Sequence, residues 1–134
     1  MLALIALDIP AGWTVLKNAF YDIGEVDRLS ESDRWAYLFG LNDMLMLTKG
    51  AYCLDLGWYG GADVHGPRSG YRLHLLRGAW YNGELLERFS SKDRHVIADR
   101  VQRFMRQVDA GAYEGRAPLP WTKEQADGSA LAER

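Results

Sequence analysis

Residues 44–59, which read MLMLTKGAYCLDLGWY, decide the fold. The pair Lys49-Gly50 separates two apolar runs, and glycine readily adopts the positive φ that a tight turn requires. In the second run, alternate residues fall on opposite faces. One face carries Tyr52, Leu54, Leu56 and Trp58, and the other carries Cys53, Asp55, Gly57 and Tyr59. The stretch therefore predicts a β-hairpin with strands over 44–48 and 51–59 and one face in the core.

Further strands are expected on both sides of this hairpin. A glycine-rich loop leads to residues 71–77, YRLHLLR, which repeat the alternation, and Asn82-Gly83 precedes a strand over 84–89. Upstream, residues 13–23, WTVLKNAFYDI, are rich in aromatic and β-branched residues, which favour a strand. Residues 1–8 fit either an edge strand or a loose terminus. Consecutive strands with short connections predict an antiparallel meander.

Two segments show helical signals. Ser30 followed by Asp33 is a capping-box pattern, and Gly40 stands where a helix would stop, so a short helix is expected between 24 and 42, with a strand over 35–39 as the alternative. This helix would place Trp35, Leu38 and Phe39 on one face. Ser90 with Asp93 repeats the capping pattern before a longer helix. Its apolar stripe consists of Ile97, Val101, Phe104, Met105 and Val108.

The predicted fold is therefore α+β, an antiparallel sheet with a short helix after the first long strand and a C-terminal helix packed on one face. A chain of 134 residues fits one domain, which is expected over residues 1–113. After Tyr113 the periodicity disappears, and Pro118 and Pro120 stand among small and charged residues. Residues 114–134 are accordingly expected to form a flexible tail with Trp121 as its anchor.

Composition excludes several classes of function. The formal net charge of -2 gives no broad basic surface, so direct nucleic-acid binding is not expected. Cys53 is the only cysteine, which rules out an internal disulfide and fits a reducing compartment. The apolar start is short and lacks a basic region, and no apolar run reaches the roughly 18 residues needed to span a bilayer. A cytoplasmic protein without membrane contact is expected.

Candidate catalytic groups are few. Cys53 and Asp55 share a strand face, and His74 joins them only if the next strand pairs in one register, which leaves a small thiol enzyme as an alternative function. A buried, inert cysteine is the simpler interpretation. His65, His74 and His95 fall in a loop, a strand and a helix, without the spacing of a metal site. Neither a metal nor another cofactor is expected.

Surface residues favour protein binding. An acidic stretch is suited to a cationic partner, and exposed aromatic side chains often dominate binding energy. The residues expected to contact a partner are Asp22, Glu25, Asp27, Glu31, Asp33, Tyr59, Trp80 and Tyr81.

Four segments, taken in order, resemble a known family: GWTVLKNAFYDI (12–23), GAYCLDLGWYGG (50–61), GYRLHLLRGAW (70–80) and LLERFSSKDRHVIADRVQRFM (85–105). The chain resembles immunity proteins of contact-dependent growth inhibition and related bacterial polymorphic toxin systems. The resemblance implies a cytoplasmic monomer that forms a heterodimer with the C-terminal toxin domain of a cognate effector, often a nuclease, and inhibits it without catalysis. An adaptor that binds proteins through a strand edge remains a further alternative.

Overall fold

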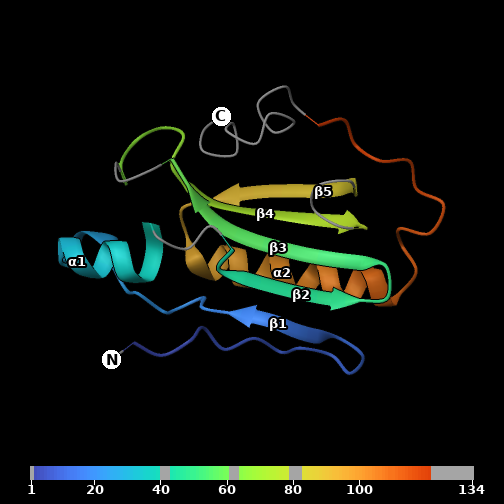
Figure 1. The fold of residues 1–134 in the computed structure, drawn as a ribbon, viewed down its shortest axis with the longest axis horizontal. Helices are drawn as coiled ribbons and strands as arrows, with labels where there is room; N and C mark the ends of the chain where they lie inside the picture. Colours follow the sequence, from blue (N-terminus) through green and yellow to red (C-terminus); the bar gives the residue numbers. More distant parts are fainter. Residues whose placement is uncertain (1, 40–42, 61–63, 79–82, 122–134) are drawn as a thin grey trace.

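The computed structural model describes residues 2–39, 43–60, 64–78 and 83–121, which form a sheet covered on one face by a long helix (Figure 1). Five antiparallel strands are described, and they lie side by side in chain order. The predicted α+β meander is confirmed. The strands are β1 (Thr14–Asn18), β2 (Leu45–Lys49), β3 (Tyr52–Tyr59), β4 (Gly70–Arg77) and β5 (Glu84–Ser91), and the helices are α1 (Glu31–Arg34) and α2 (Arg94–Asp109).

The β2–β3 hairpin has the predicted turn. Lys49 pairs with Tyr52, and Gly50 takes a φ of 58°, a left-handed conformation that favours glycine. Leu54 and Leu56 are buried on the face toward α2, as the alternation indicates. Because register fixes the face of every side chain, the same pairing places Cys53 and Asp55 on the opposite face, here called the outer face.

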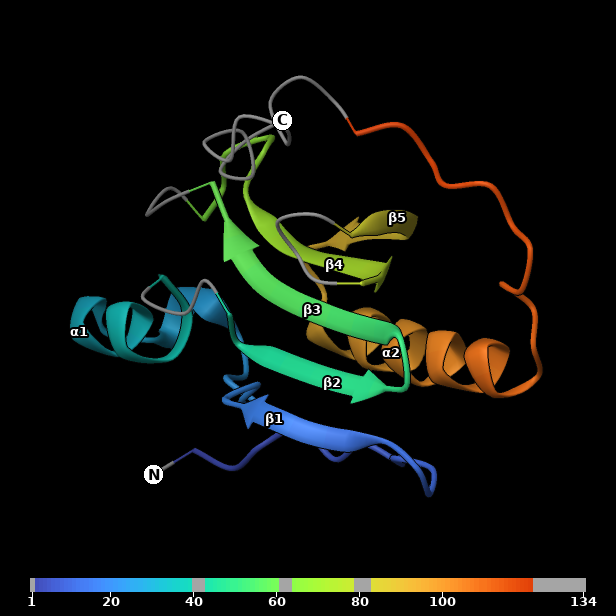
Figure 2. The ribbon, with the colours of Figure 1, turned by 45° about the vertical axis from the view of Figure 1, so that its right-hand side comes forward.

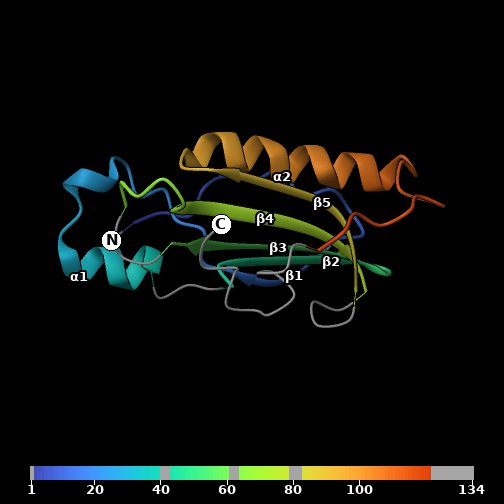
Figure 3. The ribbon, with the colours of Figure 1, turned by 90° about the horizontal axis from the view of Figure 1, so that it is seen from above.

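Helix α2 covers the face of the sheet opposite the outer face (Figure 3), and beside it Phe20 and Phe39 pack against Tyr71 and Trp58 on the same face. All five residues of the predicted apolar stripe are buried, and full burial of a large apolar side chain stabilises a fold by about 1.5–3 kcal/mol. The predicted cap is wrong. Strand β5 continues through Ser91, and Asp93 caps the helix by accepting hydrogen bonds from the N–H groups of His95 and Val96.

Strand β1 lies at one edge of the sheet and is shorter than predicted. The chain leaves β2 after Asn18, whose side-chain oxygen accepts a hydrogen bond from the Phe20 N–H. Residues 20–22 then lie beside the N-terminal segment, which runs near β1 in Figure 2. The Ile5 N–H donates to the Phe20 carbonyl at 2.8 Å, and the Asp22 N–H donates to the Ala3 carbonyl at 2.8 Å. In place of the predicted strand over 13–23, β1 pairs with β2, and residues 20–22 pair with residues 3–5.

The short helix begins where predicted, because the Ser30 hydroxyl accepts a hydrogen bond from the Asp33 N–H at 3.1 Å. A 3-10 turn (Val26–Arg28) precedes α1, and a π-helical turn (Trp35–Phe39) follows it. A π-helical turn is wider than an α-helical one, so residues three apart no longer share a face. Trp35 meets Phe39 edge to face, with ring centroids 5.2 Å apart, but Trp35 is 52% exposed and Leu38 is buried, so the predicted common face is confirmed only in part. Gly40 lies outside the described residues.

The chain beyond Tyr113 is described as far as Trp121. Leu119 donates its N–H to the Leu85 carbonyl at 2.7 Å, and Arg77 donates to the carbonyls of Tyr113 and Arg116. Trp121 stacks on His74, with ring centroids 6.1 Å apart. This part of the predicted tail therefore passes from the end of α2 to the outer face.

Candidate functional site

The acidic stretch, here called the acidic surface, lies on the segment that joins β1 to β2, at the α1 end of the molecule (Figure 1). All five carboxylates are exposed, and this acidic surface consists of Asp22, Glu25, Asp27, Glu31 and Asp33. Two of them are paired. Asp22 accepts a hydrogen bond from Arg94 Nε at 2.5 Å, which lowers the pKa of Asp22, and Asp27 lies 2.8 Å from His65 Nε2.

The other three carboxylates of this surface are unpaired. Those of Glu25, Glu31 and Asp33 make no hydrogen bond or ion pair with any residue that the structure describes. Arg28 and Arg34 lie in the same segment and offset part of this charge. The remaining like charges repel each other, and water and salt screen that repulsion only in part. A cationic partner would relieve it.

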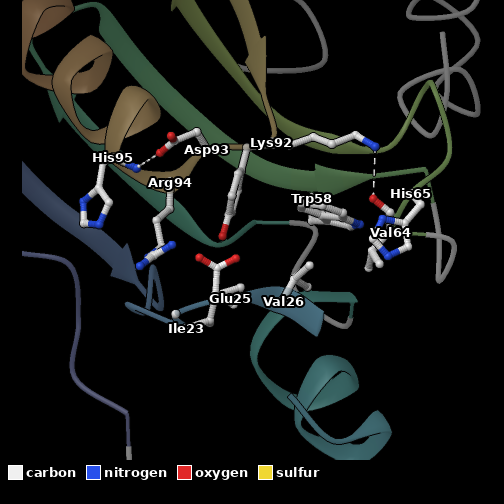
Figure 4. Close-up of a pocket in the computed structure, with 12 residues that line it drawn as sticks. Ile23, Glu25, Val26, Trp58, Val64, His65, Lys92, Asp93, Arg94 and His95 are labelled. Carbon is white, nitrogen blue, oxygen red and sulfur yellow. Dashed lines mark hydrogen bonds between the residues drawn. The ribbon is translucent and has the colours of Figure 1, made fainter. Parts of the chain in front are cut away.

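A cavity of about 450 Å³ lies between the acidic segment and the start of α2 (Figure 4). Here called the end pocket, it has an apolar wall in which the rings of Trp58 and Tyr71 meet edge to face with centroids 5.2 Å apart. Glu25 points into it from the acidic segment, opposite Arg94 and His95. The lining is mixed in charge, because Lys92 and Arg94 also line the pocket with Glu25 and Asp93. Glu25 and the aromatic wall offer a long basic side chain one carboxylate and one aromatic surface.

The aromatic residues expected at the surface are only partly described. Tyr59 is buried at 9% exposure, so its expected exposure is wrong: it lies on the outer face under the Arg72 guanidinium, 5.4 Å from the ring centroid. Trp80 and Tyr81 lie outside the described residues. Among the aromatic residues that the structure describes, the exposed one is Trp35, which follows α1 and stands two residues after Asp33 in the chain. Its exposure depends on the π-helical turn, which no sequence pattern predicted.

The outer face brings together the three residues of the enzyme alternative. Asp55 pairs directly with His74 across β3 and β4, and Cys53 lies two residues along the same face. Asp55 is 3% exposed and His74 is 1% exposed, while Cys53 is half-buried. The register that this alternative requires is therefore present.

The charge states on the outer face do not favour nucleophilic catalysis. Burial, followed by the charges of Asp55 and Asp43, raises the pKa of the Cys53 thiol to about 11. Burial, with the charges of Arg72 and Arg88, lowers the pKa of His74 to about 4. Burial also raises the pKa of Asp55. All three shifts favour the neutral form, whereas a cysteine nucleophile requires a thiolate.

The three histidines lie apart in the described structure. His65 is in the loop after β3, His74 is in β4, and His95 is in the first turn of α2. His65 and His95 both line the end pocket. Among the described residues, no group of three or more histidine, cysteine, aspartate or glutamate side chains is placed to hold a metal ion.

Comparisons with protein-family models, with curated proteins and with solved structures gave no match. The resemblance to immunity proteins therefore stays a prediction. Within the part of the chain that the structure describes, no helix combines the length and apolar character needed to cross a membrane.

Proposed function

We propose that this chain is an immunity protein that binds and neutralises the C-terminal toxin domain of a cognate contact-dependent inhibition effector. The observation that carries the proposal is the acidic surface, with three unpaired carboxylates, an exposed Trp35 and the adjacent end pocket. The family resemblance of the sequence supports the same function.

The chemistry of this surface fits a nuclease toxin. A nuclease binds the phosphates of its substrate with cationic side chains, so its substrate-binding surface attracts carboxylates. Complementary charge raises the association rate, and a desolvated aromatic anchor lowers the dissociation rate. In this arrangement Glu25, Glu31 and Asp33 supply the charge and Trp35 supplies the anchor. An inhibitor so bound covers the surface that the nucleic acid would occupy.

The proposal places the protein in the cytoplasm, where an incoming toxin domain would act, as one partner of a heterodimer. It assigns inhibition to binding and requires no catalytic residue or cofactor. Glu25 lines the end pocket, so a basic side chain of the toxin entering that pocket would contact both the carboxylate and the aromatic wall. The acidic surface and the pocket would then act as one interface.

A neutralisation experiment tests this function. The C-terminal domain of a large secreted protein encoded beside this chain is expressed in an indicator strain, with and without this chain. We expect the domain alone to arrest growth and co-expression to restore it. Continued arrest with the chain present at an equal or higher level would refute the proposal for that pair. An empty vector and an unrelated acidic protein serve as controls.

The adaptor alternative has one observation in its favour. β1 is an edge strand, and Val15 and Leu16 on it are 45% and 59% exposed. Edge strands offer unpaired backbone groups to an added strand. The register of β1 shifts between Val15 and Lys17, however, and such a bulge interrupts regular pairing. A Leu16→Lys variant separates the functions, because toxin neutralisation through the acidic surface should survive it and strand addition should not.

A further inference from the structure

A second hollow, of about 340 Å³, lies beside the loop that precedes β4 and the end of β5. Here called the basic pocket, it differs in charge from the acidic surface. None of the described residues that line it carries a carboxylate, although the whole chain has a net charge of -2. Seven of them bear side-chain hydrogen-bond donors: Arg68, Ser69, Tyr71, Arg72, Ser90, Ser91 and Lys92.

Several of these donors are held in place by the loop. Arg72 is buried and donates from Nη2 to the Arg68 carbonyl at 3.1 Å, while its guanidinium lies over the Tyr59 ring. The Ser69 hydroxyl donates to the Gly66 carbonyl at 3.0 Å. Lys92 Nζ donates to the Val64 and Gly66 carbonyls at 3.0 and 2.7 Å. The pocket is thus shaped before any ligand arrives.

Other donors are available to a ligand. An ammonium group carries three N–H donors, and the two carbonyls occupy two of those on Lys92. The exposed Arg68 guanidinium makes no hydrogen bond or ion pair with a described residue. Ser91 Oγ accepts from the Asp93 N–H, which leaves its own hydroxyl proton to donate, and Ser90 is exposed beside it. These groups match an oxyanion, which accepts several charge-assisted hydrogen bonds at once.

We propose that the basic pocket binds the phosphate group of a small phosphorylated molecule. Arg68 and Lys92 would contact the phosphate oxygens, and Ser91 would donate to them. Arg72 and Ser90 pair across β4 and β5 on the outer face, so they would contribute positive potential and a hydroxyl from that side. A volume near 340 Å³ falls at the lower end of the range for small-molecule sites, roughly 300–1,000 Å³, so the pocket accommodates more than a bare phosphate. None of the five acidic-surface residues lines the basic pocket, although Tyr71 and Lys92 line both pockets, and phosphate binding here does not require the toxin proposal.

Binding is measured by titrating the ¹⁵N-labelled full chain with inorganic phosphate, pyrophosphate and adenosine monophosphate. We expect saturable shifts of the Ser69, Ser90, Ser91 and Lys92 amide signals. Because a hydrogen bond to a charged group contributes about 1.5 kcal/mol or more, Arg68→Gln should weaken binding roughly tenfold. Ser90→Ala should weaken it less. Arg106→Gln removes the same charge from an exposed residue near the far end of α2 and should change nothing.

The probes distinguish the sources of the phosphate. Tighter binding of adenosine monophosphate than of inorganic phosphate would support a phosphorylated small molecule, whereas equal binding would overturn that part of the proposal in favour of the free ion. Absence of saturable shifts with all three probes would overturn it entirely. So would an equal loss of affinity in Arg68→Gln and Arg106→Gln, because binding would then reflect overall charge. Tight binding of an RNA oligonucleotide alone would assign the surface to a polyanion and overturn the small-molecule site.

Discussion

The buried imidazole of His74 predicts a pH-dependent stability whose sign and size follow from its surroundings. Burial and the charges of Arg72 and Arg88 lower its pKa to about 4, against 6.5 for an exposed histidine. Between these pH values the unfolded chain binds a proton that the folded chain excludes. The free energy of unfolding therefore falls as the pH drops from 6.5 toward 4. For these two pKa values the loss due to His74 is about 2 kcal/mol at pH 5.

The pH dependence of the wild type alone does not isolate the effect of His74. Asp55 lies opposite His74, and its contribution to the free energy of unfolding changes with pH in the opposite direction. The pKa of Asp55 is raised by burial and by the charge of Asp43, so its contribution favours the folded state increasingly as the pH falls through the raised value. The useful quantity is the difference between the wild type and a His74→Gln variant. Asp55 and the other two histidines are present in both proteins, so their contributions largely cancel.

The assay is urea unfolding at pH 8 and pH 5, followed by tryptophan fluorescence and analysed by linear extrapolation. At pH 8 the wild type should be the more stable protein, because His74 packs against Trp121. At pH 5 this advantage should shrink or reverse by about 2 kcal/mol relative to pH 8. An advantage that is the same at both pH values would refute the claim that His74 is buried in its neutral form.

Three further predictions concern other buried or capping groups. Asp55→Asn should raise the free energy of unfolding at pH 8 by about 1–3 kcal/mol in urea titrations, because it removes a desolvated charge. One oxygen of this carboxylate also lacks a hydrogen-bond partner among the described residues. A lower free energy of unfolding in the variant would contradict this. Asp93→Ala should destabilise the chain by about 1–2 kcal/mol and lower its Tm, because it removes the cap of α2. Ser90→Ala should have little effect on stability. A larger loss of stability in Ser90→Ala than in Asp93→Ala would show that the cap is wrongly assigned. Cys53 should react with a disulfide reagent at pH 8 about tenfold more slowly than a thiol of pKa 9.0. Its pKa is raised to about 11, which makes the thiolate about a hundredfold rarer, while the higher basicity raises the nucleophilicity of that thiolate about tenfold; an equal rate would restore the enzyme alternative.

The sheet was predictable because its signals are local. Alternation in residues 52–58 and the Lys49-Gly50 turn specify the β2–β3 pair, and the 3.6-residue stripe of α2 specifies the helix that covers it. The segment from 13 to 23 was predicted less well. Its composition favours a strand throughout, but the break after Asn18 depends on tertiary pairing of residues 20–22 with residues 3–5.

The candidate site was only partly predictable. The acidic residues can be read from the sequence. Which of them form ion pairs depends on Arg94 and His65, which are distant along the chain. Tyr59 follows the predicted alternation but is covered from the outer face, which alternation alone does not reveal. The basic pocket was not predicted, because Arg68, Arg72 and Lys92 are brought together only in the folded chain, where the loop before β4 lies beside the end of β5.

The central claim, that the acidic surface binds a toxin domain, is tested most directly by parallel purification of three tagged proteins from the native host, with mass spectrometry of what each retains. They are the wild type, a variant with Glu25, Glu31 and Asp33 changed to lysine, and a control with the same change at the exposed acids Asp8, Asp99 and Glu114. The wild type and the control should retain the C-terminal domain of a large effector, and the acidic-surface variant should lose it. Retention of that domain by all three proteins, or by none of them from cells that express the effector, would contradict the account.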